Sequence, residues 1–279
     1  MDGRILVPFG VESSLSGVGR TVGPDNRLWY RRAFRLPSAW AGQRIWLRFD
    51  AVDWDTTVWV NGHEMGRHSG GYDPFAFDIT AALVPGADQQ VTVSVWDPSD
   101  AGPQPRGKQV QRPRSIWYTP TTGIWQTVWL EPLPEVAIDR LTIVPDVDAG
   151  TVTLTASVTG AAGGSIRLRI PAPRLWSPGH PFLYDLTIAL DKGATRVDEV
   201  GSCVGLRKIA IGRSADGVMR LLLNNEPLFQ YGFLDQGFWP DGLHTAPTDE
   251  ARRFDIAWTR EIGMNLARKH IKVEPDRWY

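Results

Sequence analysis

Alternating apolar and polar positions dominate the first half of the chain. In residues 45–51, isoleucine, leucine, phenylalanine and alanine alternate with tryptophan, arginine and aspartate, and Val91, Val93 and Val95 repeat the pattern. A side-chain period of two is typical of a strand with one buried face. Glycine and proline interrupt the pattern at short intervals, as the turns of an antiparallel sandwich require. Residues 1–134 are therefore predicted to form an all-β sandwich.

The most specific pattern lies in residues 53–83, which read DWDTTVWVNGHEMGRHSGGYDPFAFDITAAL. Residues 56–60 alternate as a strand, and Asn61-Gly62 suits a type I′ turn, whose two central residues both take positive φ. Residues 63–65 can then pair back as the second arm of a hairpin. An aromatic-rich segment returns over residues 72–79, and Pro74 places this segment at a sheet edge.

Strand patterns continue beyond residue 134. Five segments with strand-like alternation or apolar character follow, at 138–144, 151–158, 165–170, 182–190 and 201–211. Residues 135–213 are therefore predicted to form a second β-sandwich with five or six strands, against the seven or so of a typical immunoglobulin-like fold.

A single helix is predicted near the C-terminal end. Thr248 is a suitable N-cap, and two acidic residues follow it in the first turn, where the helix dipole favours negative charge. Phe254, Trp258 and Ile262 recur at i, i+4 and i+8, the spacing of one helical face. Gly263 favours the end of the helix.

Composition and charge exclude several classes of function. The 279 residues are more than one typical domain requires, with 42% hydrophobic and 22% charged residues as in ordinary globular proteins. Thirty basic residues face 31 acidic ones, so the net charge of −1 gives no electrostatic basis for binding nucleic acid or an anionic membrane. No apolar run approaches membrane-spanning length, and the N-terminus lacks the pattern of a signal peptide. A cytoplasmic location is therefore favoured.

The sequence contains no pattern typical of a metal or cofactor site. Cys203 is the single cysteine, so an internal disulfide or a thiolate site is not expected. The five histidines show no paired ligand spacing, and no glycine-rich phosphate loop is present. The 13 tryptophans offer candidate platforms for sugar rings, but a role in the sandwich core is the more frequent one for this residue type. We expect no metal and no cofactor.

Three stretches of the sequence resemble one known family. The hairpin with VNG, a glycine-rich bend and Phe-Asp-Ile-Thr, the upstream WYRRAF at 29–34 and the downstream TGIWQTVWL at 122–130 resemble the sugar-binding domain of glycoside hydrolase family 2. That family includes β-galactosidases, β-glucuronidases and β-mannosidases. The resemblance implies a jelly-roll-like sandwich over 1–134 that lacks its first strand, and a shortened immunoglobulin-like sandwich over 135–213. It also implies that 214–279 form the first βαβ part of a truncated TIM barrel, with its first strand at 229–233 and its second starting at 265–268.

The resemblance implies an activity as well as a fold. It indicates the N-terminal fragment of a retaining exo-β-glycosidase that hydrolyses O-glycosyl bonds of β-galactoside-like substrates. Retaining hydrolysis uses two carboxyl groups about 5 Å apart, and in this family both are glutamates on later barrel strands, which match positions beyond Tyr279. We therefore assign no catalytic residue here, neither Glu226 nor Glu274, and expect the fragment to be inactive. The resemblance also allows a homo-oligomer of the full-length enzyme.

Five residues are candidate contacts for a carbohydrate substrate: Arg268, His270, Asp235, Trp239 and Asp100. The resemblance places Arg268 after the second barrel strand, where it orients the nucleophile. His270 stands two positions after this arginine, whereas the family has its histidine three positions after. Asp235 and Trp239 are expected on the first strand's loop, for hydroxyl binding and ring stacking. Asp100 loosely matches an aspartate that reaches the active site from the sandwich.

Two other interpretations remain open. The chain can be a non-catalytic carbohydrate-binding module that uses exposed tryptophans, or a purely structural sandwich. The predicted helix followed by NLARKH at 265–270 favours the glycosidase interpretation, because a binding module has no need of barrel elements.

Overall fold

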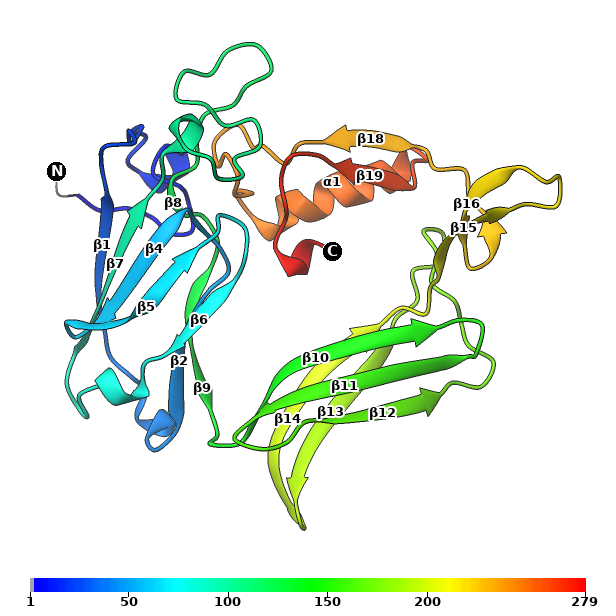
Figure 1. The fold of residues 1–279 in the computed structure, drawn as a ribbon, viewed down its shortest axis with the longest axis horizontal. Helices are drawn as coiled ribbons and strands as arrows, with labels where there is room; N and C mark the ends of the chain where they lie inside the picture. The colour runs from blue at the N-terminus through cyan, green and yellow to red at the C-terminus, as the bar shows by residue number, and fades with distance from the viewer. Residues whose placement is uncertain (1–2) are drawn as a thin grey trace. The chain divides into compact units, whose positions relative to one another are not determined.

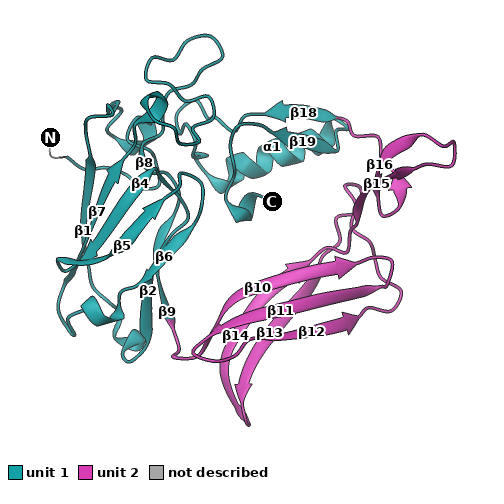
Figure 2. Ribbon diagram, in the orientation of Figure 1, with its two compact units in different colours: residues 1–132, 232–279 teal, residues 133–231 magenta. Residues whose placement is uncertain are grey.

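The computed structural model describes residues 3–279, and the fold is mainly β with one α-helix. It divides into two compact units (Figure 2): residues 1–132 together with 232–279, and residues 133–231. The first unit is therefore discontinuous in sequence. The division of the sequence into domains at 134 and 213 stays a prediction. No helix in the described part of the chain combines the length and the apolar character needed to cross a membrane.

The first unit contains three antiparallel sheets (Figure 1). The four-stranded sheet has the order β1 (Leu28–Phe34), β7 (Gln89–Trp96), β4 (Asp55–Val60) and β5 (His63–Ser69). The three-stranded sheet has the order β6 (Phe75–Asp78), β2 (Arg44–Phe49) and β9 (Val128–Leu133), and the short strands β3 (Val52–Asp53) and β8 (Gly123–Ile124) form a further pair. A 3₁₀ turn at Ser14–Ser16 precedes β1, and three more lie between the strands, at Ser38–Trp40, Thr80–Ala82 and Ser99–Ala101.

The alternating pattern places the core as predicted. Ile45, Leu47 and Phe49 of β2 are buried, and so are Val58 and Val60 of β4. These side chains join one hydrophobic cluster, because every second residue of a strand points to the same face.

The predicted hairpin is confirmed. Asn61 and Gly62 have φ of 51° and 84°, the positive values of a type I′ turn. β4 and β5 pair on either side of this turn, from Val60 opposite His63 to Asp55 opposite Ser69. The returning segment forms β6 at the edge of its sheet, where Pro74 just precedes the strand.

The second unit contains the sheets β10-β11-β12, β13-β14 and β15-β16-β17. Their bounds are Ala137–Asp146, Thr151–Thr159, Gly164–Arg169, Tyr184–Lys192, Thr195–Val204, Ile209–Arg213, Met219–Leu223 and Glu226–Pro227. One prediction is wrong here: residues 201–211 are not a single strand. β14 ends at Val204 and β15 begins at Ile209, because Leu206 between them is fully buried and bridges to Leu175.

The last segment of the first unit is a strand–helix–strand element. β18 (Gly232–Asp235) and β19 (Leu266–Lys269) pair in parallel, and α1 (Asp249–Glu261) connects them. The Thr248 Oγ1 accepts a hydrogen bond from the Ala251 N–H at 3.1 Å, which confirms the predicted N-cap. Phe254 and Trp258 of the predicted helical face are 64% and 50% exposed. A short 3₁₀ turn, Asp276–Trp278, follows β19.

Candidate functional site

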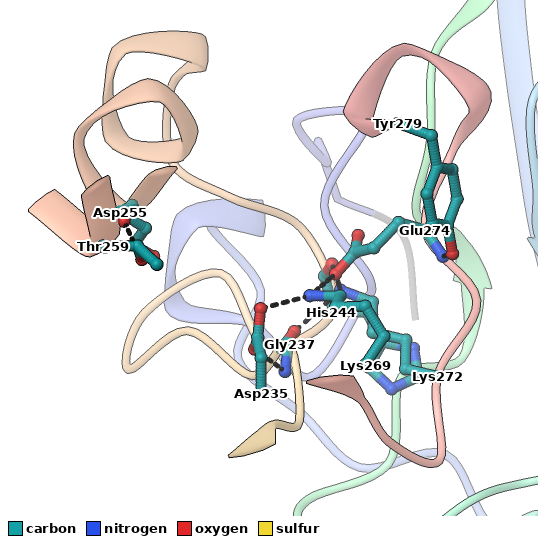
Figure 3. Close-up of polar contacts among 9 residues, drawn as sticks. All are labelled: Asp235, Gly237, His244, Asp255, Thr259, Lys269, Lys272, Glu274 and Tyr279. Atoms are coloured by element: carbon teal, nitrogen blue, oxygen red, sulfur yellow. Dashed lines mark hydrogen bonds and ion pairs between the residues drawn. The ribbon is translucent and has the colours of Figure 1, made fainter. Parts of the chain in front are cut away.

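A cluster of ionic side chains lies where β18 and β19 end (Figure 3). Asp235 and Lys269 are the last residues of the two strands and are opposite each other in the parallel register. The Lys269 Nζ lies 2.6 Å from the Asp235 Oδ2 and 2.6 Å from the Glu274 Oε1. Parallel strands place their carboxyl ends at one edge of the sheet, so the register itself brings these charges together.

Lys272 connects the segments that follow the two strands. Its side chain is fully buried, and its Nζ donates hydrogen bonds to the carbonyl oxygens of Gly237 at 2.7 Å and His244 at 2.6 Å. The same ammonium group lies 3.1 Å from the Glu274 Oε1. Burial lowers the pKa of Lys272 from its ordinary 10.5 to about 8, and the nearby Glu274 carboxylate limits the fall.

The cluster balances its own charge. Two ammonium groups face the carboxylates of Asp235 and Glu274, as buried ions require, because an unpaired ion in a protein interior costs several kcal/mol. The Asp235 carboxylate also accepts a hydrogen bond from the Gly237 N–H at 2.7 Å. Its oxygens are thus engaged within the protein, which makes Asp235 a structural organiser of the loop after β18.

Gly237 is confined by this cluster. It has φ of +66°, and a Cβ there would lie 2.6 Å from the Glu274 Oε1 and 2.7 Å from the Lys272 Cδ. Gly237→Ala is therefore expected to lower the free energy of unfolding by two effects, the strain of an alanine at positive φ and the crowding of its Cβ. The crowding is expected to contribute about 2 kcal/mol beyond the strain. Gly217→Ala is the matched control, because its φ of +78° is similar but no atom lies within 4 Å of the new Cβ. Equal losses in urea titrations of the two variants would contradict the crowding of Gly237.

Aromatic packing fixes the loop after β18 against Trp125 of the sandwich. His244 is fully buried, with ring centroids 5.1 Å from Trp125 and 4.7 Å from Phe238. Burial and the positive charge of Lys272 hold the pKa of His244 well below its usual value, so this imidazole is neutral. The Thr245 hydroxyl donates a hydrogen bond to the Trp125 carbonyl oxygen at 2.5 Å. The loop is thus fixed against the sandwich by packing and by hydrogen bonds.

Arg268 lies on the opposite side of the strand pair from Lys269. Neighbouring residues of a strand point to opposite faces, and Arg268 is exposed with Leu234 as its register partner. His270 follows β19 directly, and its N–H donates to the Asp235 carbonyl oxygen at 2.8 Å. The structure therefore brings Asp235, Arg268 and His270 to one edge of the strand pair. The side chains of Asp235 and Arg268 lie on different faces of that pair.

The other two predicted contacts lie on loops. Trp239 is half-buried, and its backbone exchanges hydrogen bonds with Leu243. Asp100 is exposed on a 3₁₀ turn, where its Oδ1 accepts from the Gln111 N–H at 3.1 Å. Trp239 belongs to the loop that Lys272 holds, whereas Asp100 belongs to the sandwich loop that precedes β8. The assignments of all five residues as substrate contacts stay predictions.

The sandwich also buries three carboxyl groups. The Thr122 N–H donates to the Glu12 Oε2 at 2.8 Å, and the Thr122 hydroxyl donates to the Asp97 Oδ2 at 2.8 Å. Burial raises the pKa of Glu12 to about 7, and burial together with Asp97 raises the pKa of Asp53 well above its usual value. Among residues 3–279, no group of three or more histidine, cysteine, aspartate or glutamate side chains has the geometry to hold a metal ion.

Sequence reasoning missed Lys272, His244 and Trp125. Each is more than 90% buried, and each makes its contacts with residues far away in the chain. The alternation Lys272-Val273-Glu274 just after a predicted strand was the available signal, since it places two opposite charges on one side of an extended segment.

Two parts of the chain match the same family. Residues 17–133 match the family model described as "Glycosyl hydrolases family 2, sugar binding domain". Residues 142–207 match the family model described as "Glycosyl hydrolases family 2". Together the two matches span more than half of the chain.

Curated relatives and solved structures agree with these matches. A β-glucuronidase of Paenibacillus borealis is 28% identical over 81% of this chain and 44% of its own length. A β-galactosidase of Thermoanaerobacter pseudethanolicus is 25% identical over 86% of this chain and 36% of its own length. The crystal structure of Ruminococcus gnavus β-glucuronidase shares the fold, with a TM-score of 0.79, 22% identity and coverage of 98% of this chain and 50% of that one.

The chain thus spans less than half the length of these curated relatives and half of the solved chain. Its two family matches include the hairpin that sequence analysis singled out, and both are to the same family. The chain belongs to glycoside hydrolase family 2.

Proposed function

We propose that this chain is the N-terminal, sugar-binding part of a retaining β-glycosidase that hydrolyses O-glycosyl bonds of β-galactoside-like substrates. In this proposal β18, α1 and β19 are the first elements of a TIM barrel. One observation carries it: the parallel strand–helix–strand element collects Asp235, Arg268 and Lys269 at the carboxyl ends of its strands. Barrel enzymes place their sites at this end of the strands.

Within the proposed enzyme, Arg268 is the residue that contacts the reacting groups. It is exposed on the face away from the Asp235–Lys269 pair, and it has no ion pair among residues 3–279. A guanidinium group there can hold a nucleophilic carboxylate by charge-assisted hydrogen bonds. Asp235 and Lys269 position the loop after β18, and through it Trp239. The two catalytic glutamates belong to later barrel strands, so the 279 residues alone hydrolyse no glycoside.

Expression of the complete open reading frame that encodes this chain tests the proposal. Its product is expected to hydrolyse a 4-nitrophenyl β-galactoside, with the β-glucuronide and β-mannoside assayed beside it. Arg268→Ala is expected to lower kcat/KM about 100-fold, roughly 2.7 kcal/mol of transition-state stabilisation. Arg253→Ala is the control, because Arg253 is exposed on α1. Equal activity of the 279-residue chain, or an unchanged Arg268→Ala variant, would refute this assignment.

A second function, non-catalytic carbohydrate binding, is favoured by one feature of the sandwich. Trp29 of β1 is 60% exposed, and its ring stacks on Trp59 of β4 with centroids 5.6 Å apart and planes 25° apart. Exposed tryptophan faces are suited to the apolar faces of sugar rings. If the complete reading frame yields a protein that binds glycans and hydrolyses none of the three glycosides, this second function takes the place of the first.

A further inference from the structure

A stretch of the sandwich that leads into β8 and β9 carries positive charge and no acidic residue. Residues 101–130 contain no aspartate and no glutamate, yet they contain Arg106, Lys108, Arg112 and Arg114. With four cations and no carboxylate, this stretch is locally positive, although the whole chain has a net charge of −1. A concentration of one sign of charge on a loop creates a local potential that attracts ligands of the opposite sign.

These cations lie on a closed and anchored loop, residues 106–118, called the basic loop below (Figure 1). The Val110 N–H donates to the Tyr118 carbonyl oxygen at 3.0 Å, and the Tyr118 N–H donates to the Lys108 carbonyl oxygen at 2.8 Å. Gln109 is buried at the base, where its Nε2 donates to the Arg106 carbonyl oxygen at 3.1 Å. Its Oε1 accepts from the Thr121 N–H at 2.5 Å. The loop is therefore held in place by its own backbone hydrogen bonds and by the buried side chain of Gln109.

The base of the basic loop lies against the ends of β18 and β19. The Tyr118 ring stacks on Phe238, with centroids 3.8 Å apart and planes 10° apart, and Phe238 belongs to the loop after β18. Gly107 lies so close to the segment after β19 that a Cβ would come within 2.4 Å of the Ile271 carbonyl oxygen. The basic loop thus borders the edge where the proposed function places its substrate.

The side chains at the tip are free to meet a ligand. Arg112 and Arg114 are exposed, and within residues 3–279 neither takes part in an ion pair. The Asp100 carboxylate is bound to the Gln111 backbone instead. Trp117 is 38% exposed beside them. Guanidinium groups bind carboxylates with two parallel hydrogen bonds, and a tryptophan offers a face to a sugar ring.

We propose that the basic loop binds an acidic oligosaccharide, in which uronate carboxylates pair with Arg112 and Arg114 and one sugar ring packs on Trp117. The proposal rests on the proposed function and narrows its substrate class to glycans that carry carboxylates. A nucleic acid would also meet a basic loop with an aromatic side chain. The balanced charge of the chain and the position of the loop beside β18 and β19 favour the glycan.

Affinity electrophoresis of the 279-residue chain tests this proposal without any catalysis. Native gels contain either polygalacturonate or neutral dextran at matched concentrations. The wild-type chain is expected to be retarded by polygalacturonate and not by dextran, and added salt is expected to weaken the effect. Arg112→Ala together with Arg114→Ala is expected to raise the apparent Kd at least tenfold. Trp117→Ala is expected to raise it several-fold.

The control removes two equally exposed positive charges elsewhere. Arg167→Ala together with Arg169→Ala, on the exposed strand β12, changes the net charge by the same amount and is expected to leave retardation unchanged. Equal retardation by dextran, equal losses in both double variants, or a tighter complex with single-stranded DNA would each overturn the proposal. None of these results bears on hydrolysis by the complete reading frame, so the proposed function is judged separately.

Discussion

Replacing Lys272 by methionine is expected to lower the free energy of unfolding of the first unit by about 3–5 kcal/mol at pH 7. Methionine fills a similar volume, so the loss is one of charge and hydrogen bonds rather than of packing. The carbonyl oxygens of Gly237 and His244 lose their donor, and the Glu274 carboxylate loses one of its two ammonium partners while it stays buried. Urea titration followed by tryptophan fluorescence measures the change.

Two further variants make this result specific. Lys192→Met removes an exposed lysine and is expected to change the free energy of unfolding by less than about 0.5 kcal/mol. Adding Glu274→Gln to Lys272→Met is expected to restore part of the loss, because the buried negative charge is then removed as well. A Lys272→Met protein as stable as the wild type would show that the ammonium group has no structural role.

The pH dependence gives an independent check on Lys272. Its pKa is lowered from 10.5 to about 8 in the folded protein, so between these values the unfolded chain binds the extra proton. Stability then rises with pH, since the unfolded state holds more protons than the folded state. The wild type is therefore expected to gain stability relative to Lys272→Met between pH 8 and 10.5. A constant difference across this interval would contradict the lowered pKa.

Replacing Glu12 by glutamine is expected to stabilise the protein by about 3 kcal/mol at pH 8, and by almost nothing below pH 4.5. Burial raises the pKa of Glu12 from 4.5 to about 7, so the folded carboxyl keeps its proton while the unfolded one has lost it. Its ionisation opposes folding, and stability falls as pH rises from 4.5 to 7. Glutamine stays neutral and still offers the Thr122 N–H an acceptor oxygen.

Urea titrations of the wild type and Glu12→Gln between pH 4 and pH 8 measure this effect. Glu135→Gln is the control, because Glu135 is exposed and its replacement changes the net charge of the chain by the same amount as Glu12→Gln. The prediction is wrong if the two variants follow the same pH profile, or if Glu12→Gln differs from the wild type by a constant amount.

Local features were predictable from the sequence. The Asn61-Gly62 turn requires positive φ at both residues, and few other pairs adopt it, so the dipeptide alone places the hairpin. Thr248 likewise identifies the first turn of α1, because its hydroxyl reaches an N–H only three residues away. The period of two in β2 is also local, and the burial of every second residue follows from it. In β7 the same period is less regular in burial, because Ser94 is buried together with Val93 and Val95.

The environment of the candidate site was not predictable in the same way. Lys272 and His244 look like ordinary polar residues until the fold buries them against Trp125, which is more than a hundred positions earlier in the chain. The predicted strand 201–211 fails for the same reason, since the burial of Leu206 against distant residues decides where β14 ends. Arg268 and Asp235 were placed near the correct strand ends, but their opposite faces depend on register.

The discontinuity of the first unit sets an order of events during synthesis. Residues 1–132 leave the ribosome first, and Gly232 follows only after the 99 residues of Leu133–Tyr231 have been made. At about 5–20 residues per second this interval lasts roughly 5–20 s. During it, the sandwich presents Trp125 and Tyr118 without the partners His244 and Phe238 that cover them later. The nascent sandwich therefore exposes an aromatic surface to solvent throughout this interval, until the C-terminal segment covers it.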